Sequence, residues 1–119
     1  MRFTFVHAAG FSKDWKALRL TDEDLSALES AIAKQPDIGP VMKGTSGLRK
    51  MRFAPPSLHR GKSGSMRVGY VAFEDLETVY LVLIFPKNAK DNLSAEEREY
   101  FRKLIPALWQ YTMQLEDKS

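Results

Sequence analysis

The segment TVYLVLIF, residues 78–85, is apolar on both alternating faces. As a strand it would place two sets of apolar side chains on opposite sides: Val79, Leu81, Leu83 and Phe85 against Tyr80, Val82 and Ile84. A strand of this kind is covered on both faces, so we predict that it lies in the middle of a sheet. The preceding segment MRVGYVAFE is a second strand, and Asp75 and Leu76 form the tip of the hairpin between them.

Three further elements are expected before this hairpin. In RFTFV, residues 2–6, Phe3 and Phe5 share one face, which predicts a half-buried strand. Two helices follow. Ser12 is the expected N-cap of a short helix that carries Trp15 and Leu18. Thr21 is the N-cap of the second, which has acidic residues in its first turn and the apolar stripe Leu25, Leu28 and Ile32, and which ends before Pro36.

The remaining elements complete an α+β domain. LRKMRF, residues 48–53, is a third strand. Ser94 and Glu97 have capping-box spacing at the start of a C-terminal helix with the stripe Phe101, Leu104, Ile105 and Leu108. Pro106 removes one helical hydrogen bond, so we expect a kink or break there and a separate short segment after it. The predicted architecture is a small antiparallel-rich sheet: strand, two helices, three-strand meander and helix, in one domain over residues 1–119.

Composition excludes several classes of function. The chain has no cysteine and two histidines, so we expect no disulfide framework, no cysteine nucleophile and no thiolate or His-rich metal site. We also expect no cofactor. No apolar run approaches the roughly 18 residues of a membrane span, and the N-terminus lacks the features of a signal peptide. We therefore expect a cytoplasmic protein without a membrane partner.

Positive charge is concentrated in the middle of the chain, although the net charge is only +3. No acidic residue lies between Asp37 and Glu74, whereas this interval contains Lys43, Arg49, Lys50, Arg52, Arg60, Lys62 and Arg67. A solvated basic loop without function is one interpretation. An uncompensated run of this length favours the other, an anionic ligand such as a polyanion bound through its phosphates.

The predicted strands bring these cations together. In LRKMRF, Lys50 and Arg52 would project from one face while Met51 and Phe53 enter the core. The loop 54–64 would carry His59, Arg60 and Lys62 past the sheet edge, Arg67 begins the next strand, and Lys87 and Lys90 follow the last one. In a meander these positions would converge on one concave surface suited to phosphate.

Three pieces, in this order, carry a family resemblance: GLRKMRFA at residues 47–54, a Gly/Lys-rich loop, and SMRVGYVAFEDLETVYLVLIFPKNAKDNLSAEEREYFRKLI at residues 65–105. The chain resembles the RelE/HigB-type toxins of bacterial type II toxin-antitoxin modules, in particular their HigB-like branch. The resemblance implies the RelE-like microbial RNase fold and a ribosome-dependent, metal-independent endoribonuclease that cuts mRNA in the A site by attack of the 2′-OH. It also implies two partners: a cognate antitoxin, HigA-like with a helix-turn-helix, and the ribosome with its mRNA and ribosomal RNA.

The same resemblance assigns residues. Lys50 and Arg52 match the basic pair of the family's second strand, and Arg67 the arginine that opens the third. We expect Arg52 and Arg67 to clamp phosphate, because a guanidinium stays charged and grips two oxygens, and Lys50 to transfer a proton. Lys87 is the expected leaving-group acid or a contact to ribosomal RNA. The expected RNA-binding residues are Arg49, His59, Arg60, Lys62 and Lys90.

Three questions stay open from the sequence. The turn PKNAKDNLS lacks the tyrosine or histidine found there in some relatives, so the general acid and base are not identified; His59 is either that group or an exposed loop residue. ParE-like toxins, which bind DNA gyrase, share the fold, and a member that binds RNA or antitoxin without cleavage is a third alternative. Four residues after Pro106 are either an antitoxin-docking patch or part of the core: Leu108, Trp109, Tyr111 and Met113.

Overall fold

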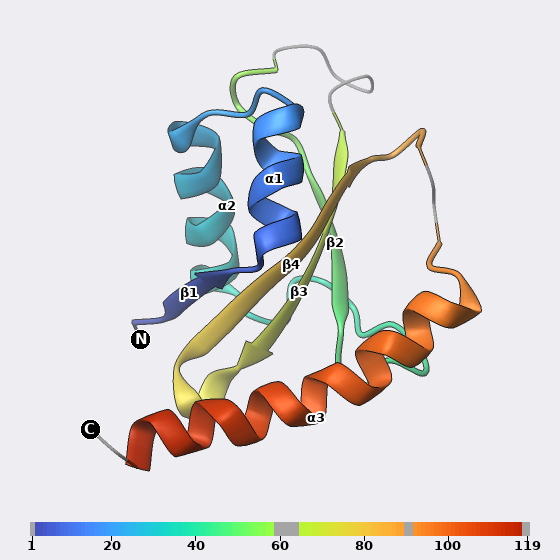
Figure 1. Ribbon diagram of the computed structural model, residues 1–119. Coiled ribbons are helices and arrows are strands. Elements are labelled where there is room, and N and C mark those ends of the chain that lie inside the picture. The colour runs from blue at the N-terminus through green and yellow to red at the C-terminus, as the bar shows by residue number, and fades with distance from the viewer. Residues whose placement is uncertain (1, 59–64, 90–91, 118–119) are drawn as a thin grey trace.

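Four strands form one mixed sheet in the order β1-β4-β3-β2. The computed structural model describes residues 2–58, 65–89 and 92–117. The elements are β1 Thr4–His7, α1 Ala9–Ala17, α2 Asp22–Lys34, β2 Arg49–Phe53, β3 Met66–Phe73, a 3-10 turn Glu74–Leu76, β4 Thr78–Pro86 and α3 Ala95–Asp117 (Figure 1). The predicted element order and the α+β class are confirmed.

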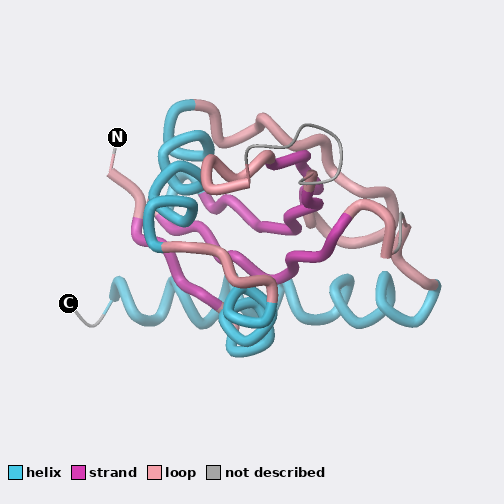
Figure 2. Tube along the Cα trace, turned by 90° about the horizontal axis from the view of Figure 1, so that it is seen from above, coloured by secondary structure: helices cyan, strands magenta, loops and turns pink. Residues whose placement is uncertain are grey.

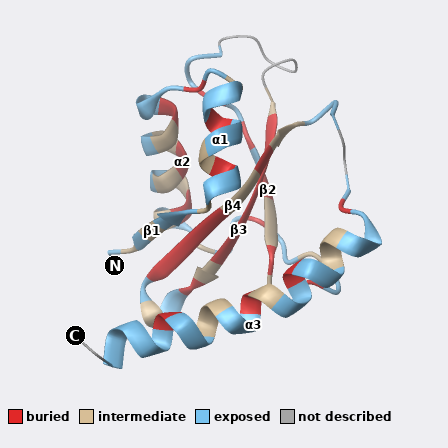
Figure 3. Cartoon of the chain, in the orientation of Figure 1, coloured by how far each residue is buried: buried red, intermediate tan, exposed pale blue. Residues whose placement is uncertain are grey.

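β4 occupies the inner position that its two apolar faces predict. It pairs parallel with β1 and antiparallel with β3, and β3 in turn pairs antiparallel with β2. The β3–β4 register shifts at Gly69 and Tyr70, where β4 contains one extra residue, Val82. The turn between the two strands lies at residues 74–76, as the sequence predicts. Figure 3 shows both inner strands as mostly buried.

Each face of the sheet has its own core. On one face, α1 and α2 contribute Phe11, Trp15, Leu28 and Ile32 to the larger hydrophobic cluster. On the other, α3 contributes Phe101 and Ile105 to a second cluster that includes Leu48, Val71, Phe73 and Tyr80. α3 crosses the sheet near the β3–β4 turn (Figure 1) and runs along one side of the strands in the view of Figure 2. The upper part of this second face is therefore left uncovered by α3.

The capping predictions succeed for two helices and fail for one. Thr21 caps α2 in a complete capping box with Asp24, and Ser94 and Glu97 form the expected box before α3. The prediction for Ser12 is wrong. α1 begins at Ala9, and the Ser12 backbone N–H already donates to the Ala8 carbonyl at 3.0 Å, so Ser12 lies inside the helix.

The predicted break at Pro106 is also wrong, because α3 is one continuous helix through this residue. A proline at this position leaves the carbonyl four residues earlier, that of Arg102, without its helical donor. The Ser46 hydroxyl donates to that carbonyl at 3.0 Å. Ile105 and Thr112 are buried on either side of the proline, so packing holds both halves of the helix to the sheet. No helix among the described residues is long and apolar enough to cross a bilayer.

The residues after Pro106 divide between the core and the surface. Leu108 and Trp109 pack against the second cluster, and the Trp109 ring meets Phe73 edge-on with 5.3 Å between centroids. Tyr111 and Met113 are exposed. Of these four residues, Tyr111 and Met113 are therefore the two that offer an exposed surface to a partner.

Candidate functional site

The alternation along β2 separates cations from core residues. Met51 and Phe53 are buried in the larger cluster, whereas Arg52 is exposed and Lys50 half-buried on the opposite face. This is the arrangement that the sequence predicts. The β2–β3 register then places Arg52 directly opposite Arg67, and Lys50 opposite Gly69. Directly opposed residues of antiparallel strands share a face, so all three cations project from the same side of the sheet.

These cations lie on the face that α3 only partly covers. Along β3 this face carries Arg67, Gly69 and Val71 in turn, and Val71 already packs in the α3 cluster. Because Gly69 has no side chain, no side chain of β3 stands between Arg67 and Val71 on this face. A Cβ at Gly69 would lie 3.1 Å from the Leu83 Cβ, tighter than most real contacts, so β4 approaches the strand closely there.

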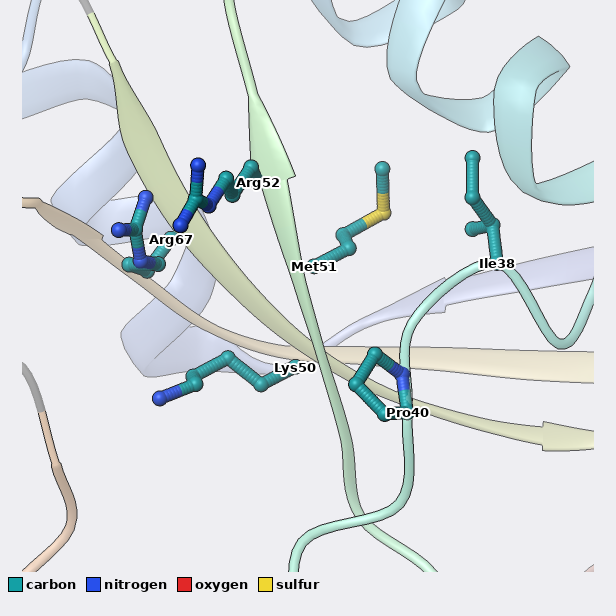
Figure 4. A pocket seen from close by; sticks show the side chains of 6 residues that line it. All are labelled: Ile38, Pro40, Lys50, Met51, Arg52 and Arg67. Carbon is teal, nitrogen blue, oxygen red and sulfur yellow. The ribbon is translucent and has the colours of Figure 1, made fainter.

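A cavity of about 570 Å³ opens at this point. Its lining residues are Ile38, Pro40, Lys50, Met51, Arg52 and Arg67. Figure 4 shows the three cationic side chains on one side of β2 and the three apolar residues on the other. The predicted convergence of Lys50, Arg52 and Arg67 is therefore seen in the structure.

Arg67 is the residue of this cavity whose surroundings most favour an anionic ligand. Its side chain is only 5% exposed although β3 places it opposite a second arginine. Its Nη1 is buried and has no hydrogen-bond partner. A buried, unpaired guanidinium N–H is destabilising, and an anionic oxygen would satisfy both its charge and its donor. The arrangement is therefore suited to bind phosphate.

Tyr70 holds residues 36–39, the segment beside β2, in place. Its hydroxyl donates to the Pro36 carbonyl at 2.7 Å and accepts the Gly39 N–H at 2.9 Å. Burial raises the pKa of Tyr70, so the hydroxyl keeps the proton that it donates. Tyr70 lies in the predicted strand MRVGYVAFE, residues 66–74, and is buried. No sequence pattern indicated the two hydrogen bonds that its hydroxyl makes.

A buried carboxylate fastens the start of the loop that follows β2. Asp24 accepts from the Ser57 N–H at 2.9 Å and from the Ser57 hydroxyl at 2.5 Å, in addition to its bond with Thr21. Burial alone would raise the pKa of Asp24, but the hydrogen bonds from Ser57 and Thr21 outweigh it and hold the pKa below its usual value. The sequence indicated a role for this acid only in the first turn of the helix.

Other predicted site residues lie elsewhere. Arg49 does not line the cavity, and its Nη1 donates to the Gly39 carbonyl at 2.7 Å. Lys87 is exposed just after β4, and its N–H donates to the Ser65 carbonyl at 3.2 Å. The remaining four, His59, Arg60, Lys62 and Lys90, lie outside the described residues. RNA contacts by all six remain predictions.

Sequence reasoning missed the apolar side of the cavity, formed by Ile38, Pro40 and Met51. The sequence signal for it was the segment IGPV, residues 38–41, which follows the second predicted helix. Pro36 and Gly39 mark this region as a turn, yet the segment is apolar. Over the ranges that the structure describes, no group of three His, Cys, Asp or Glu side chains is placed to hold a metal ion.

Comparison with known proteins identifies the class. Residues 4–117 match the family model described as the RelE toxin of the RelE/RelB toxin-antitoxin system. Because the match spans almost the whole chain, this protein belongs to the RelE toxin family.

The fold agrees with a solved member of that family. A double arginine-to-alanine mutant of the Escherichia coli toxin RelE, in the free state, superimposes with a TM-score of 0.53 at 15% sequence identity. The match covers 76% of this chain and 90% of the E. coli chain. The predicted RelE-like fold is thereby confirmed, while the HigB-like branch stays a prediction.

Proposed function

We propose that this RelE-family toxin is a metal-independent endoribonuclease that cuts mRNA in the ribosomal A site and so stops translation. One observation carries the proposal: Lys50, Arg52 and Arg67 converge in one cavity in which the buried Arg67 Nη1 has no partner. A scissile phosphate is the ligand that this donor set fits best. The fold alone would not support an activity, because unrelated functions share it.

The reaction assigned to this cavity uses the RNA as its own nucleophile. The ribose 2′-oxygen attacks the adjacent phosphorus as it loses its proton, the bond from phosphorus to the 5′-oxygen breaks, and that oxygen takes up a proton. The products are a 2′,3′-cyclic phosphate and a free 5′-hydroxyl. Arg52 and Arg67 would hold the non-bridging oxygens, where negative charge grows in the pentacoordinate state. Fixing the phosphate between two strands also aligns the attack.

Proton transfer falls to the lysines in this proposal. Lys50 lines the same cavity as the two arginines, so a phosphate bound there brings the 2′-OH within its neighbourhood. Lys87 lies beyond the cavity, at the end of β4, and would serve the leaving oxygen or contact ribosomal RNA. Arg49, His59, Arg60, Lys62 and Lys90 would extend the contact along the RNA.

Two partners follow from the proposed activity. The family implies a cognate antitoxin, for which we propose a HigA-like protein with a helix-turn-helix, and exposed Tyr111 and Met113 on α3 offer it a contact. The ribosome and its mRNA are the second partner, which places the activity in the cytoplasm.

The test is cleavage of a defined message in a purified translation system, with and without programmed ribosomes. We expect cuts only with ribosomes, ending in a cyclic phosphate, and their loss in Arg67→Ala. The matched control is Lys13→Ala, which removes one exposed cation from α1 on the far face of the sheet. This variant should cut like the wild type.

Two results would contradict the proposal. If the Arg67→Ala variant, shown to be folded by circular dichroism, cuts as well as the wild type, the cavity takes no part in the reaction. Intact message with continued translation in the wild type would reject the nuclease itself. A gyrase supercoiling assay would then test the ParE-like alternative, and salt-dependent RNA binding without cleavage would identify the non-catalytic one.

A further inference from the structure

The cavity has an apolar side that phosphate binding leaves unused. Ile38, Pro40 and Met51 face the space on the opposite side of β2 from the cations (Figure 4). Ile38 is 41% exposed, so an aliphatic side chain stands in solvent in the wall of a cavity that three cations also line. Its transfer out of water on ligand binding is a source of affinity that a free phosphate cannot use.

This apolar wall is fixed in place before any ligand arrives. Tyr70 holds the Pro36 carbonyl and the Gly39 N–H, and Arg49 holds the Gly39 carbonyl. The Pro40 carbonyl accepts from the β2 backbone N–H of Lys50 at 3.1 Å. Hydrogen bonds on both sides of Ile38 therefore attach the wall to the same two strands that carry the cations.

Gly39 allows this attachment. A Cβ at this position would lie 2.9 Å from the Lys50 carbonyl oxygen, a separation that real Cβ atoms do not show. Any larger residue would push the segment away from β2 and widen the cavity. The spacing between the apolar wall and the cations is consequently set by main-chain packing.

We propose that this wall, formed by the exposed Ile38 and Pro40 together with the largely buried Met51, binds the face of a nucleobase next to the phosphate that Arg67 holds. The inference rests on the proposed function and names a base subsite within the same cavity. A nucleotide has the required two-part chemistry, since its phosphate is anionic and the faces of its base are apolar. The cavity of about 570 Å³ lies within the ~300–1,000 Å³ typical of ligand sites.

The chemistry of the wall predicts how the base is recognised. None of its three side chains carries a strong hydrogen-bond donor that could read a base edge. Contact with the flat face of a base is tolerant of sequence, because all four bases offer such a face. The subsite should thus raise affinity for RNA generally and should discriminate little between bases.

The test uses a dinucleoside phosphate with a 2′-deoxy group at the attack position, so that it binds without being cut, and two analogues that each lack one base. Binding is followed by NMR titration of the labelled toxin. We expect one abasic analogue to bind roughly five- to tenfold more weakly than the intact probe. This is the loss of affinity expected when about one or two methylene-sized groups are no longer buried. Ile38→Ala should remove most of that difference.

Val41→Ala is the matched control. Val41 lies three residues beyond Ile38, is 51% exposed and does not line the cavity. This variant should keep the full difference between intact and abasic probes. Both substitutions are at exposed positions, so both variants should fold, and their amide spectra report it.

Arg67→Ala separates the base subsite from the phosphate site. This variant should lose affinity for intact and abasic probes alike. If Ile38→Ala binds every probe as the wild type does, the base subsite is refuted while the phosphate site stands. If the wild type binds no probe, or if Arg67→Ala binds all of them unchanged, the phosphate site is refuted and the subsite with it.

Discussion

Replacing Arg67 by methionine should stabilise the protein while it abolishes RNA cleavage. The substitution keeps an unbranched apolar stem in place of the arginine stem and removes the buried guanidinium, whose Nη1 has no partner. Leaving such a donor unsatisfied costs about 1–3 kcal/mol. The change also removes the repulsion from Arg52, which lies directly opposite on β2.

The size of that repulsion can be bounded. If the two guanidinium groups were as close as the ~5 Å that separates Cβ atoms of opposed residues, their unit charges would repel by roughly 3 kcal/mol at an effective dielectric constant of 20, which is an upper bound. Arg52 is exposed, so solvent and salt reduce this to about 1 kcal/mol or less. Some of the gain is offset by imperfect packing of the methionine. We therefore expect Arg67→Met to raise the free energy of unfolding by about 1–3 kcal/mol.

Urea denaturation at fixed ionic strength measures the effect as a shift in midpoint with an unchanged slope. Arg49→Met is the matched control on the neighbouring strand. The Arg49 guanidinium donates to the Gly39 carbonyl at 2.7 Å, so its loss should destabilise by about 1–2 kcal/mol. The two substitutions make the same chemical change and should act with opposite signs.

Phosphate provides the second measurement. At tenfold above its dissociation constant an anion that binds only the folded state stabilises it by about 1.4 kcal/mol. Replacing chloride by phosphate should stabilise the wild type and leave Arg67→Met unaffected. If Arg67→Met instead lowers stability by more than about 1 kcal/mol and the wild type ignores phosphate, then Arg67 is a structural residue and the ligand argument fails.

Three further predictions concern the supports around the site. Because the pKa of Asp24 is lowered, its hydrogen bonds stabilise the fold above the unfolded pKa of ~3.9 and lose this effect as pH falls through the folded pKa. Asp24→Asn should therefore cost about 1–2 kcal/mol in urea denaturation at pH 7, and this cost should shrink steadily as the pH falls below ~3.9. Tyr70→Phe should speed hydrogen exchange of the Gly39 amide and lower stability by about 1–3 kcal/mol, and unchanged exchange would show that the hydroxyl does not hold the wall. Ser46→Ala should cost about 0.5–1 kcal/mol in the wild type and less in a Pro106→Ala background, where the restored N–H takes over the carbonyl; equal costs in this double-mutant cycle would contradict the explanation of the continuous helix.

Residue alternation predicted which β2 side chains are cationic and which enter the core, because a strand has a fixed period of two and the apolar members must be buried. It could not predict that Arg52 lies opposite Arg67. The two strands are separated by a loop that fixes no particular register, and a shift by two residues would keep the same pattern of faces. The opposed arginines are nevertheless what gives the site its unsatisfied charge.

The errors at Ser12 and Pro106 have a common cause. Local sequence rules were applied at positions where a tertiary contact, or another residue nearby, decides where the helix begins or whether it continues. Ala8 starts α1 without a side-chain cap, one turn before the serine that the rule favours. At Pro106 the local penalty is real, but a hydroxyl 56 residues away in the chain satisfies the affected carbonyl. The apolar wall escaped prediction for the same reason, because Tyr70 holds it from more than 30 residues away.

The length and position of α3 explain how one sheet face can serve both core and ligand. Where α3 crosses, β3 contributes Val71 and Phe73 to the packed cluster. Beyond the helix the same face of the same strand carries Arg67, a charge that an inner strand would otherwise exclude. A covered sheet face would bury this cation without any compensation, whereas the open end allows an anion to reach it. The buried arginine is thus explained if a ligand completes the fold at this place, and the opposite signs expected for Arg67→Met and Arg49→Met test that explanation directly.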